Sequence, residues 1–78
     1  MAFEINKTEY LIKFGKQIEK LRTNQRLSLR QLAQNCEIDH SDISKIEKGE
    51  RNIQLSTILE LAKGLNLHPK KLLDFEIN

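Results

Sequence analysis

The sequence contains no valine and no tryptophan, and only one cysteine, one proline and three glycines among 78 residues. A single cysteine excludes a disulfide within the chain and a cysteine-rich metal site. So few glycines and prolines argue against a turn-rich all-β fold and against disorder. No apolar run approaches the ~20 residues of a membrane span, and the N-terminus lacks a signal pattern. We therefore expect a soluble, cytoplasmic, helical protein.

The length allows one small domain, residues 1–78, with little space for an enclosed catalytic pocket. Twelve leucines and nine isoleucines supply most of its apolar side chains. The two histidines, the cysteine and the scattered acids show neither a metal-ligand spacing nor a catalytic constellation. We therefore expect no enzyme activity, no metal and no cofactor.

The net charge of +2 is small but unevenly distributed. Residues 7–30 carry seven basic and two acidic side chains, whereas residues 31–47 have four acidic and one basic. A basic first third is compatible with a polyanionic partner, and equally with an ordinary solvated helix surface.

Apolar periodicity predicts the first helix over residues 7–24, where Leu11, Phe14, Ile18 and Leu21 recur at three- and four-residue steps. Asn6 or Thr8 is a candidate N-cap, and residues 1–6 form an N-terminal arm. Apolar residues at helical spacing predict a fourth helix from residue 55 to 65. A short fifth helix follows, with Pro69 in its first turn.

Between these lies a pattern typical of two short helices joined by a tight turn. Ser28 and Gln31 have the spacing of a capping box, and Asp39 is the next N-cap candidate. Gly49 ends the second of these helices in a left-handed conformation. The spacing predicts a helix-turn-helix over residues 28–48, although many such hairpins are merely structural.

Specific residues strengthen this interpretation. They are Leu32-Ala33, Ile38, the run Ile43-Ser44-Lys45-Ile46-Glu47, and Gly49. With the downstream runs from Leu61 to Leu65 and from His68 to Leu72, they resemble the Xre family, the small repressors of phage Cro and cI type. The resemblance covers about residues 10–75. It implies an all-α, five-helix, lambda-repressor-like DNA-binding domain with the helix-turn-helix at helices 2 and 3.

The chain departs from the family pattern at two places. Glu37 stands in the turn where the family usually has glycine, and a positive φ there would cost Glu about 1 kcal/mol. Leu29 stands where the family often has a glutamine that reaches a DNA phosphate. That phosphate contact is therefore not expected here.

The resemblance also implies which side chains meet DNA. The outward residues of the third helix face base edges, namely His40, Ser41, Ser44 and Lys45. His40 has a purine or a phosphate as its alternative partners. Asp42 has two open roles, the capping of its helix and the acceptance of a hydrogen bond from cytosine. The expected phosphate contacts, with surface solvation as the alternative, are Arg26, Arg30, Lys48, Arg51 and Asn52.

Arg22 and Glu47 match a structural ion pair of the family, so Arg22 is not expected to face DNA. Apolar side chains gather near the two termini, and exposed groups of that kind usually mark a partner surface. The candidates for a dimer interface are Phe3, Ile5, Phe75 and Ile77.

The resulting hypothesis is a sequence-specific regulator that binds palindromic double-stranded DNA as a homodimer. The alternative is a protein-interaction module, such as an antitoxin that binds a toxin, or an adaptor for another protein partner. Three regulators share the sequence pattern: phage-type repressors, restriction–modification controllers and antitoxins.

Overall fold

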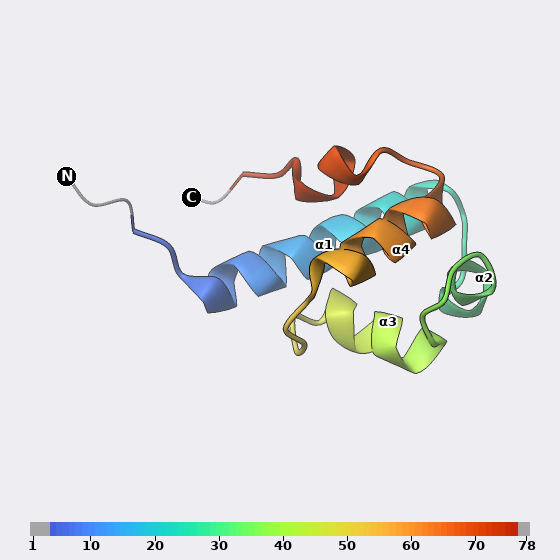
Figure 1. Ribbon diagram of the computed structural model, residues 1–78, viewed down its shortest axis with the longest axis horizontal. Helices are drawn as coiled ribbons and strands as arrows, with labels where there is room; N and C mark the ends of the chain where they lie inside the picture. The colour runs from blue at the N-terminus through green and yellow to red at the C-terminus, as the bar shows by residue number, and fades with distance from the viewer. Residues whose placement is uncertain (1–3, 77–78) are drawn as a thin grey trace.

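A computed structural model describes residues 4–76. They form four α-helices and one 3-10 helix (Figure 1): α1 (Lys7–Asn24), α2 (Leu29–Gln34), α3 (His40–Glu47), α4 (Leu55–Leu65) and η1 (Pro69–Leu73). The expected fifth helix is present as a 3-10 helix, so a count of five α-helices is not confirmed for this part of the chain. The segment is only five residues long, and short pieces of this kind are where 3-10 geometry is common; Pro69 in its first turn suits either kind of helix.

The remaining helix ends follow the sequence pattern. Asn6 caps α1 by accepting a hydrogen bond from the Glu9 N–H at 3.0 Å. Ser28 and Gln31 form the complete capping box of α2, and Asp39 caps α3. These local hydrogen bonds satisfy N–H groups that the first helical turn leaves without partners.

The core draws on every helix. Ile18, Leu32, Ile43, Leu65 and Leu72 are completely buried, one from each of the five elements in chain order. No polar or charged residue among the described ones is fully buried. The helices therefore enclose one apolar centre, and the polar side chains lie on the outside.

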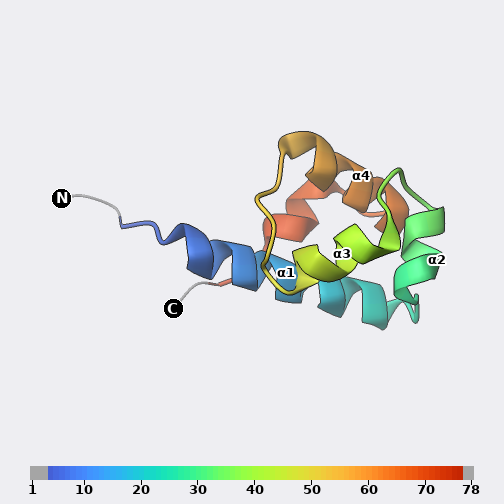
Figure 2. The same cartoon turned by 90° about the horizontal axis from the view of Figure 1, so that it is seen from below.

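Helix α3 lies on the outer face of the molecule. In Figure 1 it lies along the lower edge, whereas η1 lies along the upper edge. Figure 2, seen from below, shows α3 on the side turned toward the viewer. In residues 4–76, no helix is both long and apolar enough to cross a membrane.

Helices α1 and α3 approach very closely at Gly15. A Cβ atom on Gly15 would lie 2.5 Å from the Glu47 carbonyl oxygen, and it would also collide with the carbonyl oxygen of Ile46. Only glycine leaves room for these two backbones. The C-terminal turn of α3 is thus seated directly on α1.

An ion pair holds the same two helices together. Arg22 Nε donates to Glu47 Oε2 at 2.7 Å, and Arg22 Nη2 donates to Glu47 Oε1 at 3.0 Å. Arg22 Nη1 also donates to the Leu27 carbonyl at 2.8 Å, at the entrance to α2. The Arg22 side chain is only 12% exposed and that of Glu47 only 7%. The hydrogen bond to Glu47 raises the pKa of Arg22. The expected structural pair is confirmed.

We expect Gly15→Ala to lower the free energy of unfolding by at least about 2 kcal/mol, because the added methyl group forces α1 and α3 apart. Urea unfolding would measure the change. Lys16→Ala is the matched control, since Lys16 is exposed on the same helix and its loss should change stability by less than about 0.5 kcal/mol. Equal stability of the two variants would contradict the close approach.

We expect Arg22→Ala to cost about 3 kcal/mol or more, because the Glu47 carboxylate is then left buried without its partner. A double-mutant cycle with Glu47→Gln, followed by thermal unfolding, should give a coupling energy of about 0.5–3 kcal/mol. Additive losses would show that the two side chains stabilise the fold independently.

Candidate nucleic-acid interface

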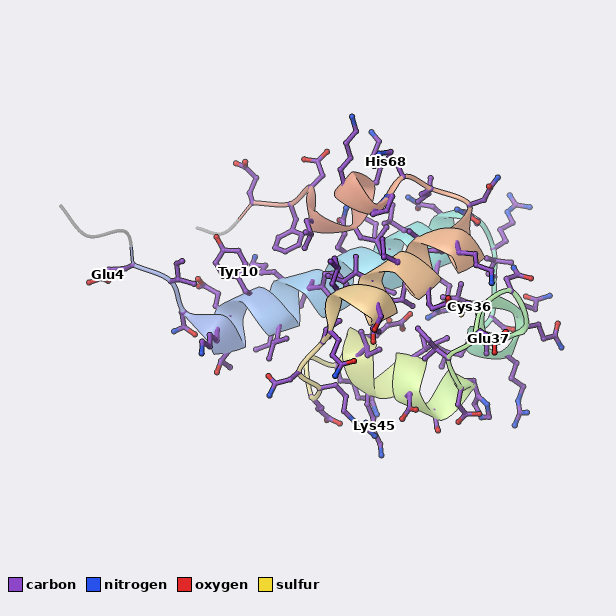
Figure 3. The ribbon with its side chains drawn as sticks, in the orientation of Figure 1. Glu4, Tyr10, Cys36, Glu37, Lys45 and His68 are labelled. Atoms are coloured by element: carbon purple, nitrogen blue, oxygen red, sulfur yellow. The ribbon has the colours of Figure 1, made fainter. Side chains whose placement is uncertain are left out.

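The outer face of α3 is polar because its inner face is anchored. Ile43 and Ile46 are buried at three-residue spacing, which turns Ser41 and Lys45 toward solvent. Lys45 projects from the lower edge of the molecule in Figure 3, opposite His68. Ser44 and His40 are half-buried at the margins of this face. The four predicted base-contact residues therefore lie on one short helix with its backbone held rigidly.

The start of α3 is fixed by Asp39. Its carboxylate accepts hydrogen bonds from the Ser41 N–H, at 3.3 Å, and from the Ser41 hydroxyl. Donation by that hydroxyl lowers the pKa of Asp39. Because the Ser41 hydroxyl proton is donated to Asp39, the hydroxyl oxygen can take part in a further hydrogen bond only as an acceptor. In this conformation Ser41 suits a donor on a base, such as an exocyclic amino group.

Two of the predicted contacts meet at a shallow hollow between α2 and α3. Arg30 and His40 both line it, with Ala33 and Ile38 at its floor. The hollow has a volume of about 260 Å³. It brings a predicted phosphate contact next to a predicted base contact, although the two residues are ten positions apart in the sequence.

The other predicted phosphate contacts occupy different positions. Arg26 is exposed in the turn after α1 and adopts a left-handed conformation with φ of 58°. Lys48 is exposed at the end of α3. Arg51 is held by Asp42, whose Oδ1 accepts from Arg51 Nη2 at 3.0 Å. Asn52 is exposed and lines an apolar groove with Lys7 and Ile53. These predicted phosphate contacts therefore come from the turn before α2, the end of α3 and the loop after it.

The turn between α2 and α3 contains a contact that the sequence did not predict. The Glu37 N–H donates to Glu60 Oε1 of α4 at 2.9 Å. The positive-φ residues in the described chain are Arg26, Gly49 and Asn66, so Glu37 is accommodated without left-handed strain. No local pattern could have predicted Glu60, since it lies 23 positions away and only the packing of α4 brings it to the turn.

Leu29 and Cys36 point toward the interior of the helix-turn-helix. Both are partly buried and pack against the core. Burial raises the pKa of the Cys36 thiol, which donates to the Leu32 carbonyl at 3.4 Å. Within residues 4–76, no three His, Cys, Asp or Glu side chains are grouped as a metal site would require.

This arrangement, a capped surface helix seated on two others by its apolar side, defines the helix-turn-helix class. The helix-turn-helix family HTH_3 matches residues 18–72 of the chain. The control protein C.BamHI of Bacillus amyloliquefaciens is 38% identical over 63 residues, which are 80% of this chain and 78% of that protein. The control protein C.SmaI of Serratia marcescens is 39% identical over 56 residues, 72% of this chain and 67% of its own length.

A solved structure agrees with these relatives. The restriction–modification controller protein C.AhdI from Aeromonas hydrophila is 40% identical and superposes with a TM-score of 0.77, over 80% of this chain and 94% of that one. The chain therefore belongs to the HTH_3 family of Xre-type helix-turn-helix regulators. It is a DNA-binding transcriptional regulator and not an enzyme.

Proposed function

We propose that the protein is a restriction–modification controller that acts in the cytoplasm as a homodimer on a palindromic operator. The observation that carries this proposal is the outer face of α3, where Ser41 and Lys45 are exposed on a helix whose other side is buried. The relatives at 38–40% identity support the choice of a controller over a phage-type repressor or an antitoxin.

In this proposal α3 enters the major groove and its side chains read base edges. Lys45 donates to guanine O6 and N7, Ser41 and Ser44 bond to neighbouring bases, and His40 reaches a purine or the backbone. Phosphate contacts fix the position of the domain on the duplex and supply much of the affinity. They come from Arg26, Arg30, Lys48, Arg51 and Asn52.

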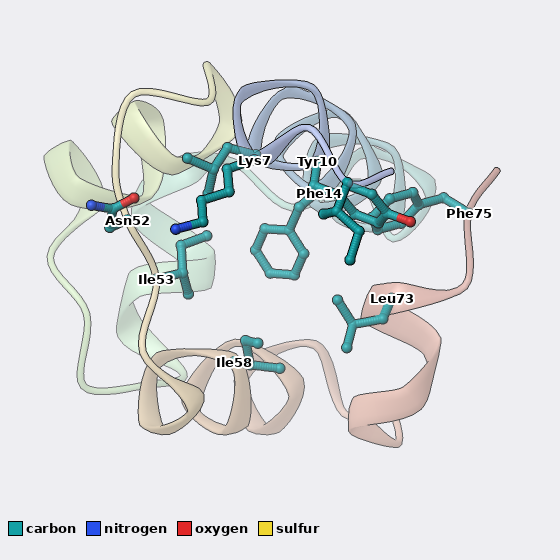
Figure 4. A pocket seen from close by; sticks show the side chains of 10 residues that line it. Lys7, Tyr10, Phe14, Asn52, Ile53, Ile58, Leu73 and Phe75 are labelled. Carbon is teal, nitrogen blue, oxygen red and sulfur yellow. The ribbon is translucent and has the colours of Figure 1, made fainter. Parts of the chain in front are cut away.

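A homodimer follows from the small number of base contacts that one such domain makes. A two-fold dimer would place two α3 helices about 34 Å apart, one turn of DNA, and so match a palindrome. Two of the predicted interface residues, Ile5 and Phe75, line an apolar groove of about 470 Å³ (Figure 4). Phe3 and Ile77 lie outside the described residues.

The groove also shows how the monomer covers part of its own apolar surface. Phe75 is half-buried against the Tyr10 ring, with 6.2 Å between ring centroids. Ile5 and Leu73 remain 64% and 55% exposed at the groove. We therefore place the dimer contact on Ile5 and Leu73, with Phe75 as a supporting residue.

The second candidate is a protein-interaction module that binds a toxin or another protein. The same groove favours it, because an apolar groove with exposed leucine and isoleucine suits a protein partner as well as a second copy. Binding to duplex DNA that weakens steeply with added salt would separate a DNA-binding protein from this alternative.

We expect Lys45→Ala to weaken operator binding by about 1–3 kcal/mol and to relax the preference at one base position. A binding-site selection followed by titration would measure both effects. Lys70→Ala is the control, since Lys70 is exposed on η1 and loses the same charge away from α3. Unchanged base preference in the Lys45 variant would remove it from the set of base-reading residues.

We expect Leu73→Lys to shift sedimentation toward the monomer and to reduce operator affinity about a hundredfold, because two linked modules bind far more tightly than one. The fold should survive, since this leucine is exposed. Leu55→Lys is the matched control, an exposed leucine that does not line the groove. If only the Leu55 variant becomes monomeric, the interface lies at the start of α4 and the groove assignment is wrong.

A further inference from the structure

The ion pair between Asp42 and Arg51 links the first turn of α3 to the loop that follows this helix. Arg51 Nη2 lies 3.0 Å from Asp42 Oδ1, and the two side chains are 44% and 46% exposed. The residues are nine positions apart, so the loop folds back along α3 to bring them together. The pair therefore lies on the edge of the face that the proposed function turns toward DNA.

Asp42 is not needed to cap its helix. Asp39 accepts the capping hydrogen bond at the start of α3, and within residues 4–76 the Asp42 side chain accepts its one hydrogen bond from Arg51. The sequence left the role of Asp42 open between a cap and a base contact. In the structure its carboxylate has neither role and instead binds Arg51, a cation of the same surface.

Arg51 is distinguished from the other predicted phosphate contacts by this partner. In the described part of the chain, Arg26, Arg30 and Lys48 have no carboxylate within 4.0 Å, whereas Arg51 has Asp42. A carboxylate and a phosphate offer a guanidinium the same planar pair of acceptor oxygens. Since the Asp42 contact uses Nη2 of Arg51, a phosphate that binds Arg51 either displaces Asp42 or shares the guanidinium with it.

Resting on the proposed function, we propose that Asp42 competes with DNA phosphate for Arg51 and so lowers the affinity of the protein for DNA of any sequence. Sequence-independent binding is electrostatic and scales with the number of phosphates that the protein neutralises. A cation that carries its own counter-charge contributes less to it. Because the ion pair is half-exposed, it is weak enough to open, and it attenuates the contact without abolishing it.

The direct test is the affinity of Asp42→Asn for a random-sequence duplex, titrated from roughly 50 to 200 mM salt. We expect the plot of log K against log salt to steepen by up to about 0.9, the value for one complete phosphate contact. If the variant and the wild type bind equally at about 1 M salt, a slope difference of about 0.9 makes the variant bind about eightfold more tightly at about 0.1 M. Circular dichroism and thermal unfolding would check that α3 is intact.

A double-mutant cycle with Arg51→Gln separates competition from simple repulsion between Asp42 and DNA. If Asp42 acts through Arg51, the gain from Asp42→Asn disappears in the Arg51→Gln background. Glu50→Gln is the matched control, because Glu50 is exposed next to Arg51 in the chain and its substitution also removes one negative charge. Its effect should be the same in both backgrounds.

Each outcome decides the matter. An equal gain from Asp42→Asn in both backgrounds, or no gain in either, overturns the competition. A change in base preference at one operator position without a change on random DNA would instead make Asp42 a base-reading residue. Failure of the wild-type protein to bind either duplex would refute the proposed function, whereas normal wild-type binding with an additive cycle refutes this inference alone.

Discussion

The seating of α3 on α1 is the constraint on which the rest of the structure depends. Gly15 removes the side chain that would separate the two backbones, and the Arg22–Glu47 pair then closes over the contact with two short hydrogen bonds. The two devices differ in their physics. The glycine sets how near the helices come, whereas the ion pair sets their rotation, because a bidentate guanidinium–carboxylate contact tolerates little change of angle. Since Arg22 also binds the Leu27 carbonyl, the entrance to α2 is held by the same side chain.

This constraint explains how a chain with a thin core can hold the polar outer face of α3 in a fixed position. A domain of this size buries too little apolar area to tolerate a loosely held helix. The short helix α3 is therefore fixed at both ends, by the Asp39 cap at its start and by Glu47 at its finish, with Ile43 and Ile46 between them. Exposed polar side chains can then be placed on its outer face at no cost to the core.

The surface around α3 combines attraction and restraint. The surface near α3 contains both cations and acids, among them the paired Arg51 and Asp42, so it is not a uniformly basic patch. Uniform positive charge would favour any DNA sequence, because electrostatic affinity does not depend on the bases. In the competition proposed for Asp42, acids near the cations would reduce that general affinity and leave base contacts a larger share of the recognition. The same logic fits a small regulator that must find a few operators among many competing sites.

The sequence by itself determined the features that depend on neighbours along the chain. The bounds of α1, the capping box of Ser28, the Asp39 cap and the glycine at the end of α3 were all predictable, because caps and helical periodicity arise within a few residues. The Arg22–Glu47 pair was predicted only through family resemblance, since no local rule joins residues 25 positions apart. Only the tertiary structure decided that the last element is a 3-10 helix, that Glu60 holds the turn at Glu37, and that Arg51 folds back onto Asp42. These depend on where packing places distant segments, and packing is a property of the whole core.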